Sequence, residues 1–315
     1  TTWGWGRSGY GARLGLDYPE LKEYLEAERL CVDKALDQAI TLIESELESD
    51  IGGAIRHGVM SGGKRLRPIL CTTAYRECGG RAEKNVYDLA ASLEMIHAYS
   101  LMHDDLPCMD DAELRRGQAT THSVFGEDVT IRAAAALIPA AARQALQSAR
   151  KLECGASGAA AVVQKLLEAA GAGGMVGGQW LDLLGEGQTL SPTELDELHQ
   201  RKTGALLTAS LVMGALAATA EKETVSALAS YGRSIGLAFQ ITDDVLDATQ
   251  SAELLGKNPS DVDLDKSTYV GLYGLDQAKE HARERIADAL GALESIDIDA
   301  PVLTVLARYV IERER

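Results

Sequence analysis

The sequence predicts an all-α fold, a single large bundle of helices around a central cavity. No segment of the 315 residues shows the alternation of apolar and polar side chains that indicates a half-buried strand. Strand-like and helix-like segments do not alternate along the chain either, which argues against an α/β fold. Apolar residues recur instead at helical spacing, and a hydrophobic content of 46% can supply a large core.

The first half of the chain predicts these elements in order. Residues 1–18 are interpreted as an arm, leader or tag, because they lack the continuous apolar core of a signal peptide, and one domain is expected over 19–315. Residues 19–48 predict one or two amphipathic helices. Glycines then precede a buried helix at 66–75 and a long helix at 81–104. A loop is expected at Thr120-Thr121-His122, followed by a helix over 131–149 that Pro139 interrupts and a helix over 159–170.

The second half begins with closely spaced glycines at 171–178, which predict close helix crossings or a widened pocket. Ser191, Pro192 and Glu194 predict a helix start with a capping box. Residues 203–220 are uncharged but mostly small, so they favour a buried helix over a membrane span. A helix over 231–247 and amphipathic helices over 268–313 complete the bundle.

An acidic stretch lies between His103 and Gly117, where four aspartates precede the adjacent Arg115 and Arg116. Clustered carboxylates repel one another unless a cation lies between them. Mg²⁺ fits, because it takes one or two carboxylates together with phosphate oxygens. Asp104 and Asp110 would project roughly 120° apart on one helix, so the chain is expected to bend at Pro107.

A second acidic cluster, Asp243, Asp244 and Asp247, has the same chemistry and predicts one shared metal site. Asp243 and Asp247 would project about 40° apart, on one helix face. The net charge of −16 argues against a broad nucleic-acid surface, so anionic substrates need local basic clusters. These clusters occur at Lys64-Arg65-Arg67, Arg115-Arg116, Arg201-Lys202, and Lys257 with Lys266.

From about residue 19 onward the sequence resembles the trans-isoprenyl diphosphate synthases, especially the bacterial and plastid short-chain enzymes. The resemblance rests on motifs in one order: Gly62-Gly63-Lys64-Arg65-Leu66-Arg67-Pro68, Glu94-Met95-Ile96-His97, the first acidic stretch, Gly178-Gln179 with Asp182, Lys202-Thr203-Gly204, the second acidic cluster, Leu255-Gly256-Lys257 and Asp265-Lys266-Ser267-Thr268-Tyr269. It departs from the family where Ala134-Ala135 replaces a usual Gly-Asp, which leaves open altered packing or a weakened site.

The resemblance implies a prenyltransferase that condenses isopentenyl diphosphate with dimethylallyl or geranyl diphosphate, using three Mg²⁺ ions bound with the diphosphate. For isopentenyl diphosphate it implies Lys64, Arg67, His97 and Arg116. For the allylic side it implies Arg115, Lys202, Thr203, Gln240, Lys257 and Lys266, with Arg115, Lys202, Thr203 and Gln240 taken as catalytic. The metal site is assigned to Asp104, Asp105, Asp110 and Asp243. Within it, Asp105 is expected to share with Asp244 and Asp247 the role of a carboxylate that supports ligands or metal-bound waters.

Product length is assigned to Tyr99, with Ser100 beside it. Tyr99 precedes Asp104 by five residues, about 7.5 Å along a helix, and a bulky aromatic there resembles the farnesyl synthases. Helical-wheel geometry does not decide whether Tyr99 faces the product or packs into the core, since Tyr99 would project about 140° from Asp104. Residues 112–118 instead resemble bacterial geranylgeranyl synthases. Because Tyr99 can physically block a growing chain, whereas Ala112 and Glu113 lie beyond the metal end, farnesyl diphosphate is expected as the main product and geranylgeranyl diphosphate is the alternative.

Two rival functions are weighed. A non-catalytic partner of a sister enzyme would be expected to lose a metal cluster, and both are intact here. A class I terpene cyclase binds one diphosphate and would not need basic elements on both sides of the first acidic stretch.

The resemblance implies a homodimer. The five cysteines are odd in number and form no close pair that resembles a metal or redox motif, which favours the cytosol. A plastid is left open if residues 1–18 are the remnant of a leader.

Overall fold

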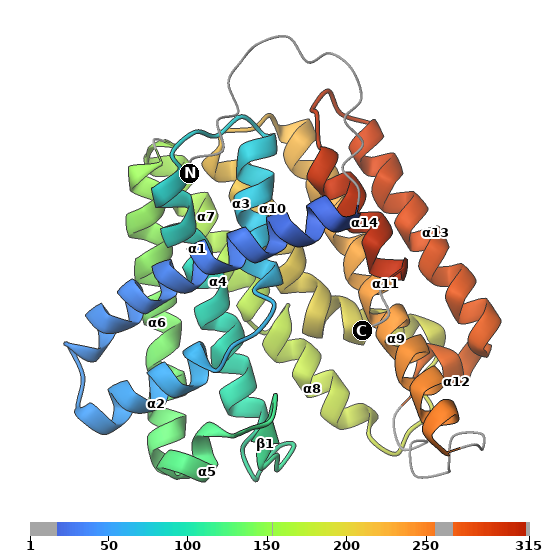
Figure 1. Cartoon of the computed structure of the whole chain (residues 1–315), viewed down its shortest axis with the longest axis horizontal. Coiled ribbons are helices and arrows are strands. Elements are labelled where there is room, and N and C mark those ends of the chain that lie inside the picture. The colour runs from blue at the N-terminus through green and yellow to red at the C-terminus, as the bar shows by residue number, and fades with distance from the viewer. Residues whose placement is uncertain (1–17, 153, 256–266, 313–315) are drawn as a thin grey trace.

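The computed structural model describes residues 18–152, 154–255 and 267–312, and these parts form an all-α bundle (Figure 1). The predicted fold class is confirmed. The first half comprises α1 (Tyr18–Glu44), α2 (Ser49–Met60), α3 (Leu66–Glu77), α4 (Glu83–Asp104), β1 (Leu114–Arg115), β2 (Gln118–Ala119), α5 (Thr121–Phe125) and α6 (Glu127–Lys151). The second half comprises α7 (Gly155–Ala170), α8 (Met175–Gly185), α9 (Pro192–His199), the π-helical turn η1 (Gln200–Gly204), α10 (Ala205–Ala217), α11 (Lys222–Leu255), α12 (Tyr269–Tyr273), α13 (Leu275–Glu294) and α14 (Pro301–Glu312).

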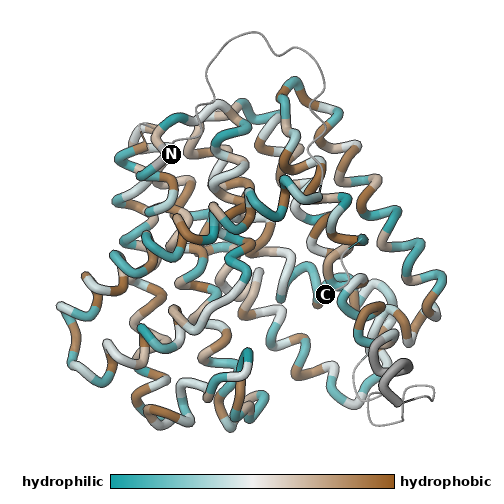
Figure 2. The backbone as a smooth tube through the Cα atoms, in the orientation of Figure 1, coloured by the Kyte–Doolittle hydropathy of each residue, from teal (hydrophilic) through white to brown (hydrophobic). Residues whose placement is uncertain are grey.

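Helix α10 lies in the middle of the bundle, where it packs against α3, α7 and α11. Nearly every side chain of α10 is buried, as its run of small and aliphatic residues predicts. The outer helices instead alternate between hydrophobic and hydrophilic stretches (Figure 2). None of the described helices is long and apolar enough to cross a membrane. Because its side chains are buried, the uncharged helix α10 belongs to the core.

Several predicted boundaries are confirmed in outline. Residues 19–48 form α1 and lead into α2, and the long helix that carries the first acidic stretch is α4. At the start of α9, the Ser191 hydroxyl accepts from the Glu194 backbone N–H, while the Glu194 carboxylate accepts from the Ser191 N–H. This reciprocal pair is the predicted capping box.

Two local predictions are wrong. Thr121 and His122 belong to the short helix α5, not to a loop. Pro139 does not interrupt its helix, because α6 continues through it. A proline removes the hydrogen bond to the carbonyl four residues earlier, here Ala135. Ala135 is exposed, so water can satisfy that carbonyl and the helix persists.

The antiparallel pair β1–β2 was not predicted, because each strand has only two residues and no alternating pattern. Arg116 and Gly117 connect the strands with φ angles of 54° and 76°. Positive φ at both central residues is the geometry of a type I′ turn, which matches the twist of a tight hairpin. We call residues 114–119 the arginine hairpin, because Arg115 and Arg116 lie in it.

Candidate active site

The first acidic stretch forms the predicted bend. Helix α4 ends at Asp104, and the chain turns back through Pro107 so that the Asp110 N–H donates to the Asp104 carbonyl at 2.9 Å. Burial raises the pKa of Asp104 to about 6, with Asp110 and Asp105 adding to the rise and Lys202 opposing it. A carboxylate at a helix C-terminus also faces the negative end of the helix dipole. Asp104 therefore lies where a bound cation would be stabilising.

Asp105 lies in the same bend but has a different environment. Its carboxylate is buried and accepts from Arg115 Nε at 2.7 and 2.9 Å and from Arg115 Nη2 at 2.5 Å. The Ala112 N–H donates to the Asp105 carbonyl at 3.2 Å, which fixes the return of the chain toward the hairpin. Asp105 is thus paired with a guanidinium within its own loop.

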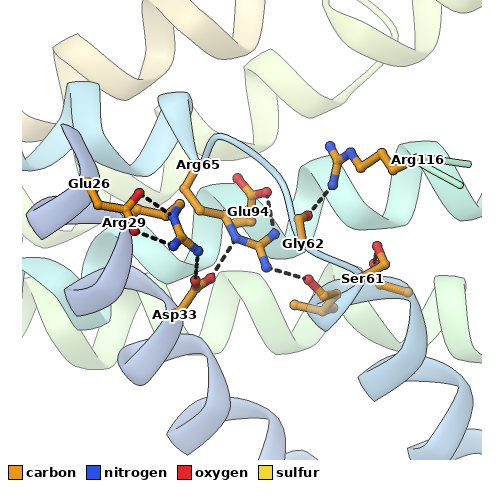
Figure 3. Close-up of polar contacts among 10 residues, drawn as sticks. Glu26, Arg29, Asp33, Ser61, Gly62, Arg65, Glu94 and Arg116 are labelled. Carbon is orange, nitrogen blue, oxygen red and sulfur yellow. Dashed lines mark hydrogen bonds and ion pairs between the residues drawn. The ribbon is translucent and has the colours of Figure 1, made fainter. Parts of the chain in front are cut away.

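Residues 61–63, which we call the glycine loop, precede α3 and contact the arginine hairpin through Arg116 (Figure 3). Arg116 Nη1 donates to the Gly62 carbonyl. A Cβ at Gly63 would lie 2.6 Å from Arg116 Nη1, and Gly63 has a φ of 136°. Only glycine meets both conditions comfortably, so Gly63 makes room for the Arg116 side chain.

Arg67 and Arg116 form a cation group, with the ring of His97 beside them, at the meeting of α3, α4 and the arginine hairpin. Burial and then the neighbouring cations Arg67 and Arg116 lower the pKa of His97 well below its usual value. Arg67 Nε is buried and has no hydrogen-bond partner. A buried guanidinium N–H without an acceptor is costly, so this group is suited to receive an anion such as a diphosphate.

Arg65 lies in the same basic cluster of the sequence but has another role. Its φ of 51° turns the side chain inward, where it donates to Asp33 and Glu94, both at 2.8 Å, and to the Val59 carbonyl at 3.0 Å (Figure 3). Only 4% of Arg65 is exposed. Arg65 therefore joins α1 and α4 beneath the loop, while Lys64 is exposed above it.

Lys202 and Thr203 lie in η1, a type of turn that is frequent at functional sites. Lys202 Nζ donates to Asp182 Oδ2 of α8 at 2.6 Å. A Cβ at Gly178 would collide with the Lys202 backbone N–H, so the glycine allows α8 to approach η1 closely. The predicted close crossing in the glycine-rich segment is confirmed here. Next to it, both amide atoms of Gln179 are buried without partners.

The second acidic cluster lies on α11. Asp244 accepts from the Tyr269 backbone N–H at 2.8 Å, and burial raises the pKa of Asp244 to about 6, with Asp243 and Asp247 adding to the rise. Asp244 therefore fixes the start of α12, which is compatible with its expected role as a supporting carboxylate. Gln240, half-buried, lies one turn before Asp244 on α11. Figure 1 shows α4 and α11 running toward the same end of the bundle.

His199 is a residue of this region that the sequence analysis did not single out. Its ring stacks on Tyr269 with a centroid distance of 5.5 Å, and Tyr269 Oη donates to Asp196 Oδ1 at 2.5 Å. Burial lowers the pKa of His199 to about 4. Its only signal in the sequence is its place one helical turn before Lys202, which many structural histidines would share.

The carboxylates fit magnesium that arrives with a diphosphate. No group of three or more His, Cys, Asp or Glu side chains that could hold an ion by itself occurs in the described parts of the chain. Mg²⁺ commonly takes one or two carboxylates and completes its shell with water and substrate phosphates. Asp104, Asp110 and Asp243 supply carboxylates of this kind, whereas the oxygens of Asp105 already accept from Arg115.

Tyr99 is half-buried on α4, and its ring lies 6.0 Å from that of His103. Burial and then the carboxylate of Asp104 raise the pKa of Tyr99, so the phenol lies toward the acidic bend. The Ser100 hydroxyl donates to the His97 carbonyl at 2.9 Å and is thus held within its own helix. Lys257 and Lys266, which were assigned to the allylic side, lie outside the described residues.

The fold and this site are those of a helical enzyme that handles diphosphates, and comparison with known proteins gives the family. The polyprenyl synthetase family model matches residues 48–300. The chain belongs to the polyprenyl synthetase family and is a short-chain trans-prenyltransferase.

Relatives of known name agree. The chain is 40% identical to a chloroplastic geranylgeranyl pyrophosphate synthase of Capsicum annuum, over 93% of this chain and 79% of that protein. It is also 40% identical to a dimethylallyltranstransferase of Fischerella ambigua, over 93% of this chain and 84% of that protein.

Solved structures share the fold. The FPP/GFPP synthase of Zymomonas mobilis has a TM-score of 0.81 at 31% identity, covering 93% of this chain and 99% of that chain. The geranyltransferase of Legionella pneumophila has a TM-score of 0.79 at 31% identity, covering 94% and 98%.

Proposed function

We propose that this chain condenses isopentenyl diphosphate with dimethylallyl or geranyl diphosphate and releases farnesyl diphosphate. The observation that carries the proposal is the meeting of two charged groups across the arginine hairpin. The hairpin contacts the acidic bend through the Arg115–Asp105 pair, and its Arg116 belongs to the group that Arg67 and His97 complete. The first suits a diphosphate that brings metal ions, and the second suits a diphosphate that needs none.

Magnesium ions, three in this proposal, would be held by Asp104, Asp110 and Asp243 and would neutralise the charge that grows on the allylic diphosphate as its carbon–oxygen bond breaks. Arg115 and Lys202 would bind the same diphosphate, and Lys257 and Lys266 are assigned to it as well. Asp182 of α8 already holds the Lys202 ammonium in place, so the Lys202 side chain loses less entropy when substrate binds.

The second substrate would bind with its diphosphate on Lys64, Arg67, His97 and Arg116. Its double bond attacks the allylic cation, and the released diphosphate takes up the proton that is lost, so the protein need not supply a strong base. Thr203 and Gln240 would present oxygen atoms to the cation, an electrostatic role that depends on fixed dipoles.

Tyr99 supports farnesyl diphosphate as the main product. Its aromatic ring lies along α4 before the acidic bend, half-buried, where it could limit the length of a growing chain. Geranylgeranyl diphosphate is the second candidate, because the Capsicum annuum relative and several Arabidopsis thaliana relatives are named for that product.

The deciding experiment supplies labelled isopentenyl diphosphate with dimethylallyl, geranyl or farnesyl diphosphate and Mg²⁺, and separates the products by chain length. We expect labelled farnesyl diphosphate from the first two starters and little extension of the third. Extension of the third starter would establish the geranylgeranyl product. A cyclised hydrocarbon or the absence of any product would instead support the terpene cyclase or the non-catalytic partner.

The same proposal includes a homodimer and a cytosolic location. All five cysteines are free thiols in the structure, which suits a reducing compartment. Some relatives are named as chloroplastic or mitochondrial, so import into a plastid is the alternative. Light scattering of the purified chain would test the dimer.

A further inference from the structure

Asp105 differs from the other aspartates of the acidic bend in what its carboxylate contacts. Only 4% of the residue is exposed, and both oxygens accept hydrogen bonds from Arg115, Oδ1 at 2.7 and 2.5 Å and Oδ2 at 2.9 Å. A two-point contact between a carboxylate and a guanidinium is among the strongest and most directional ion pairs in proteins. The negative charge of Asp105 is therefore matched within its own loop.

This pair anchors one strand of the arginine hairpin. Arg115 opposes Gln118 in the β1–β2 pair, and the next residue, Arg116, has a φ of 54°. Left-handed backbone in a residue other than glycine costs about 1 kcal/mol or more, so the surrounding contacts must hold it. A hairpin this short has no core of its own and depends on anchors at its ends.

The second anchor lies on the glycine loop. Arg116 donates to the Gly62 carbonyl and rests against Gly63, where no side chain could fit without a shift. The path from Asp105 to Gly62 thus consists of two side-chain contacts, one at Arg115 and one at Arg116, joined by a single peptide bond. It connects the acidic bend with the loop that leads into the cation group.

We propose that Asp105 is a positioning residue, which anchors the arginine hairpin and orients Arg115 and Arg116 toward the two diphosphates, and that it does not bind magnesium. This inference rests on the proposed function, because it takes Arg115 and Arg116 as the groups that bind substrate. It gives Asp105 a specific partner, Arg115, in place of the general supporting role that the resemblance implies.

The test is a double-mutant cycle of Asp105→Ala and Arg115→Ala, with Asp104→Asn as the comparison for metal binding. We expect Asp105→Ala to raise the KM for the allylic diphosphate about 10-fold to 100-fold, the range for loss of a charged hydrogen bond. In the Arg115→Ala background the same change should have less than about a twofold effect, because Asp105 acts through Arg115. The Mg²⁺ concentration for half-maximal rate should move in Asp104→Asn and stay near wild type in Asp105→Ala.

A control separates positioning from loss of stability. Glu28 is also buried and pairs with a guanidinium, that of Arg76 at 2.9 Å, on the α1 side of the bundle. Glu28→Gln should lower the Tm while leaving both KM values near wild type. If Asp105→Ala does not fold, the allylic KM of the double variant is compared with that of Arg115→Ala alone. The double variant is expected to fold, since removing both members of a buried pair leaves no unpaired charge.

Two results would overturn the inference and make Asp105 a metal ligand. One is that Asp105→Ala raises the allylic KM as much in the Arg115→Ala background as in wild type. The other is that Asp105→Ala shifts the Mg²⁺ dependence as much as Asp104→Asn does. Failure of the proposed function is a different result. It would appear as wild-type protein that transfers no isopentenyl unit, before any variant is compared.

Discussion

Lys202 Nζ donates to Asp182 Oδ2 at 2.6 Å, and this contact joins η1 to α8. The same ammonium group acts on Asp104 at the end of α4, where it opposes the rise in the pKa of that carboxyl. Lys202 is therefore paired with Asp182 of α8 and lies within electrostatic range of Asp104 of α4. In the proposed function, the allylic diphosphate would bind the Lys202 ammonium while Asp182 continues to hold the side chain.

Asp182→Asn should therefore lower kcat/KM for the allylic diphosphate by about 10-fold to 100-fold, the usual cost of losing a group that orients a ligand. Lys202→Met should cost more, because it removes the cation itself. The matched control is Glu197→Gln, which removes a surface partner of the adjacent Arg201, 2.5 Å away. Steady-state kinetics on the three variants checks the prediction, and an Asp182→Asn enzyme with wild-type kinetics would contradict it.

The shared metal site predicts that Asp104→Ala and Asp243→Ala each lower kcat by at least about 100-fold. The reason is that each change removes a carboxylate to which the proposed function assigns metal near the breaking bond. Far-ultraviolet circular dichroism should show unchanged helical content. The control is Asp111→Asn, since Asp111 is exposed in the same bend and asparagine tolerates its φ of 48°. Near-normal turnover in either alanine variant would mean that the two acidic clusters do not share one site.

The cation group predicts a selective effect on isopentenyl diphosphate. Arg116→Gln should raise the KM for this substrate by an amount equivalent to about 1.5–3 kcal/mol, the value of a hydrogen bond to a charged group, and should affect the allylic KM less. The exposed Arg132, which pairs with Asp128 within α6, provides the control variant Arg132→Gln. A larger change in the allylic KM would show that the two diphosphate sites are exchanged.

Glu77 predicts a pH dependence of stability away from the site. Its carboxylate accepts from the Val302 N–H at 2.8 Å at the start of α14, and burial raises its pKa to about 8 from the ordinary value of 4.5. Between these values the folded chain binds a proton that the unfolded chain has released. Stability should therefore fall as pH rises from about 4.5 to 8, by up to about 1.4 kcal/mol per pH unit, and level off above that range.

Denaturant unfolding between pH 5 and 9 checks this prediction by comparing wild type with Glu77→Gln, which cannot ionise. The difference in free energy of unfolding between the two proteins should change with pH, because only wild type can ionise residue 77. Glu294→Gln, at an exposed position of α13, should leave the slope unchanged. A wild-type slope retained in Glu77→Gln would assign the effect to other groups.

Much of the fold and part of the site could be predicted from the sequence, because some signals are local. The bend after Asp104 follows from a proline between two aspartate pairs, and the start of α9 follows from a capping box. The two wrong local predictions have physical causes. Pro139 is tolerated because Ala135 faces solvent, and the residues after Thr120 are too few to show a helical period.

The roles within each charged cluster could not be predicted, because they depend on tertiary contacts. Arg65 and Arg67 are two residues apart, yet a left-handed φ turns Arg65 onto Asp33 and Glu94, while Arg67 keeps a buried N–H without a partner. Asp104 and Asp105 are adjacent, yet only Asp105 meets Arg115. Spacing alone identifies the cluster, and only the packing of α1, α4 and the arginine hairpin separates its members.

Tyr99 gives the last prediction, which concerns product length. Its half-buried ring lies beside His103, and its hydroxyl is close enough to Asp104 for that carboxylate to raise its pKa. In the proposed function the product chain grows along α4, where an aromatic ring would take up volume and alanine would free it. Tyr99→Ala should therefore shift the product from farnesyl toward longer diphosphates in the labelled assay, with kcat for the first condensation little changed. The matched control is Tyr309→Ala, since Tyr309 is an aromatic residue of α14 that contacts Tyr18 away from the acidic bend. A Tyr99→Ala enzyme with the wild-type product, or a wild-type enzyme that already makes mainly geranylgeranyl diphosphate, would show that other residues limit the chain.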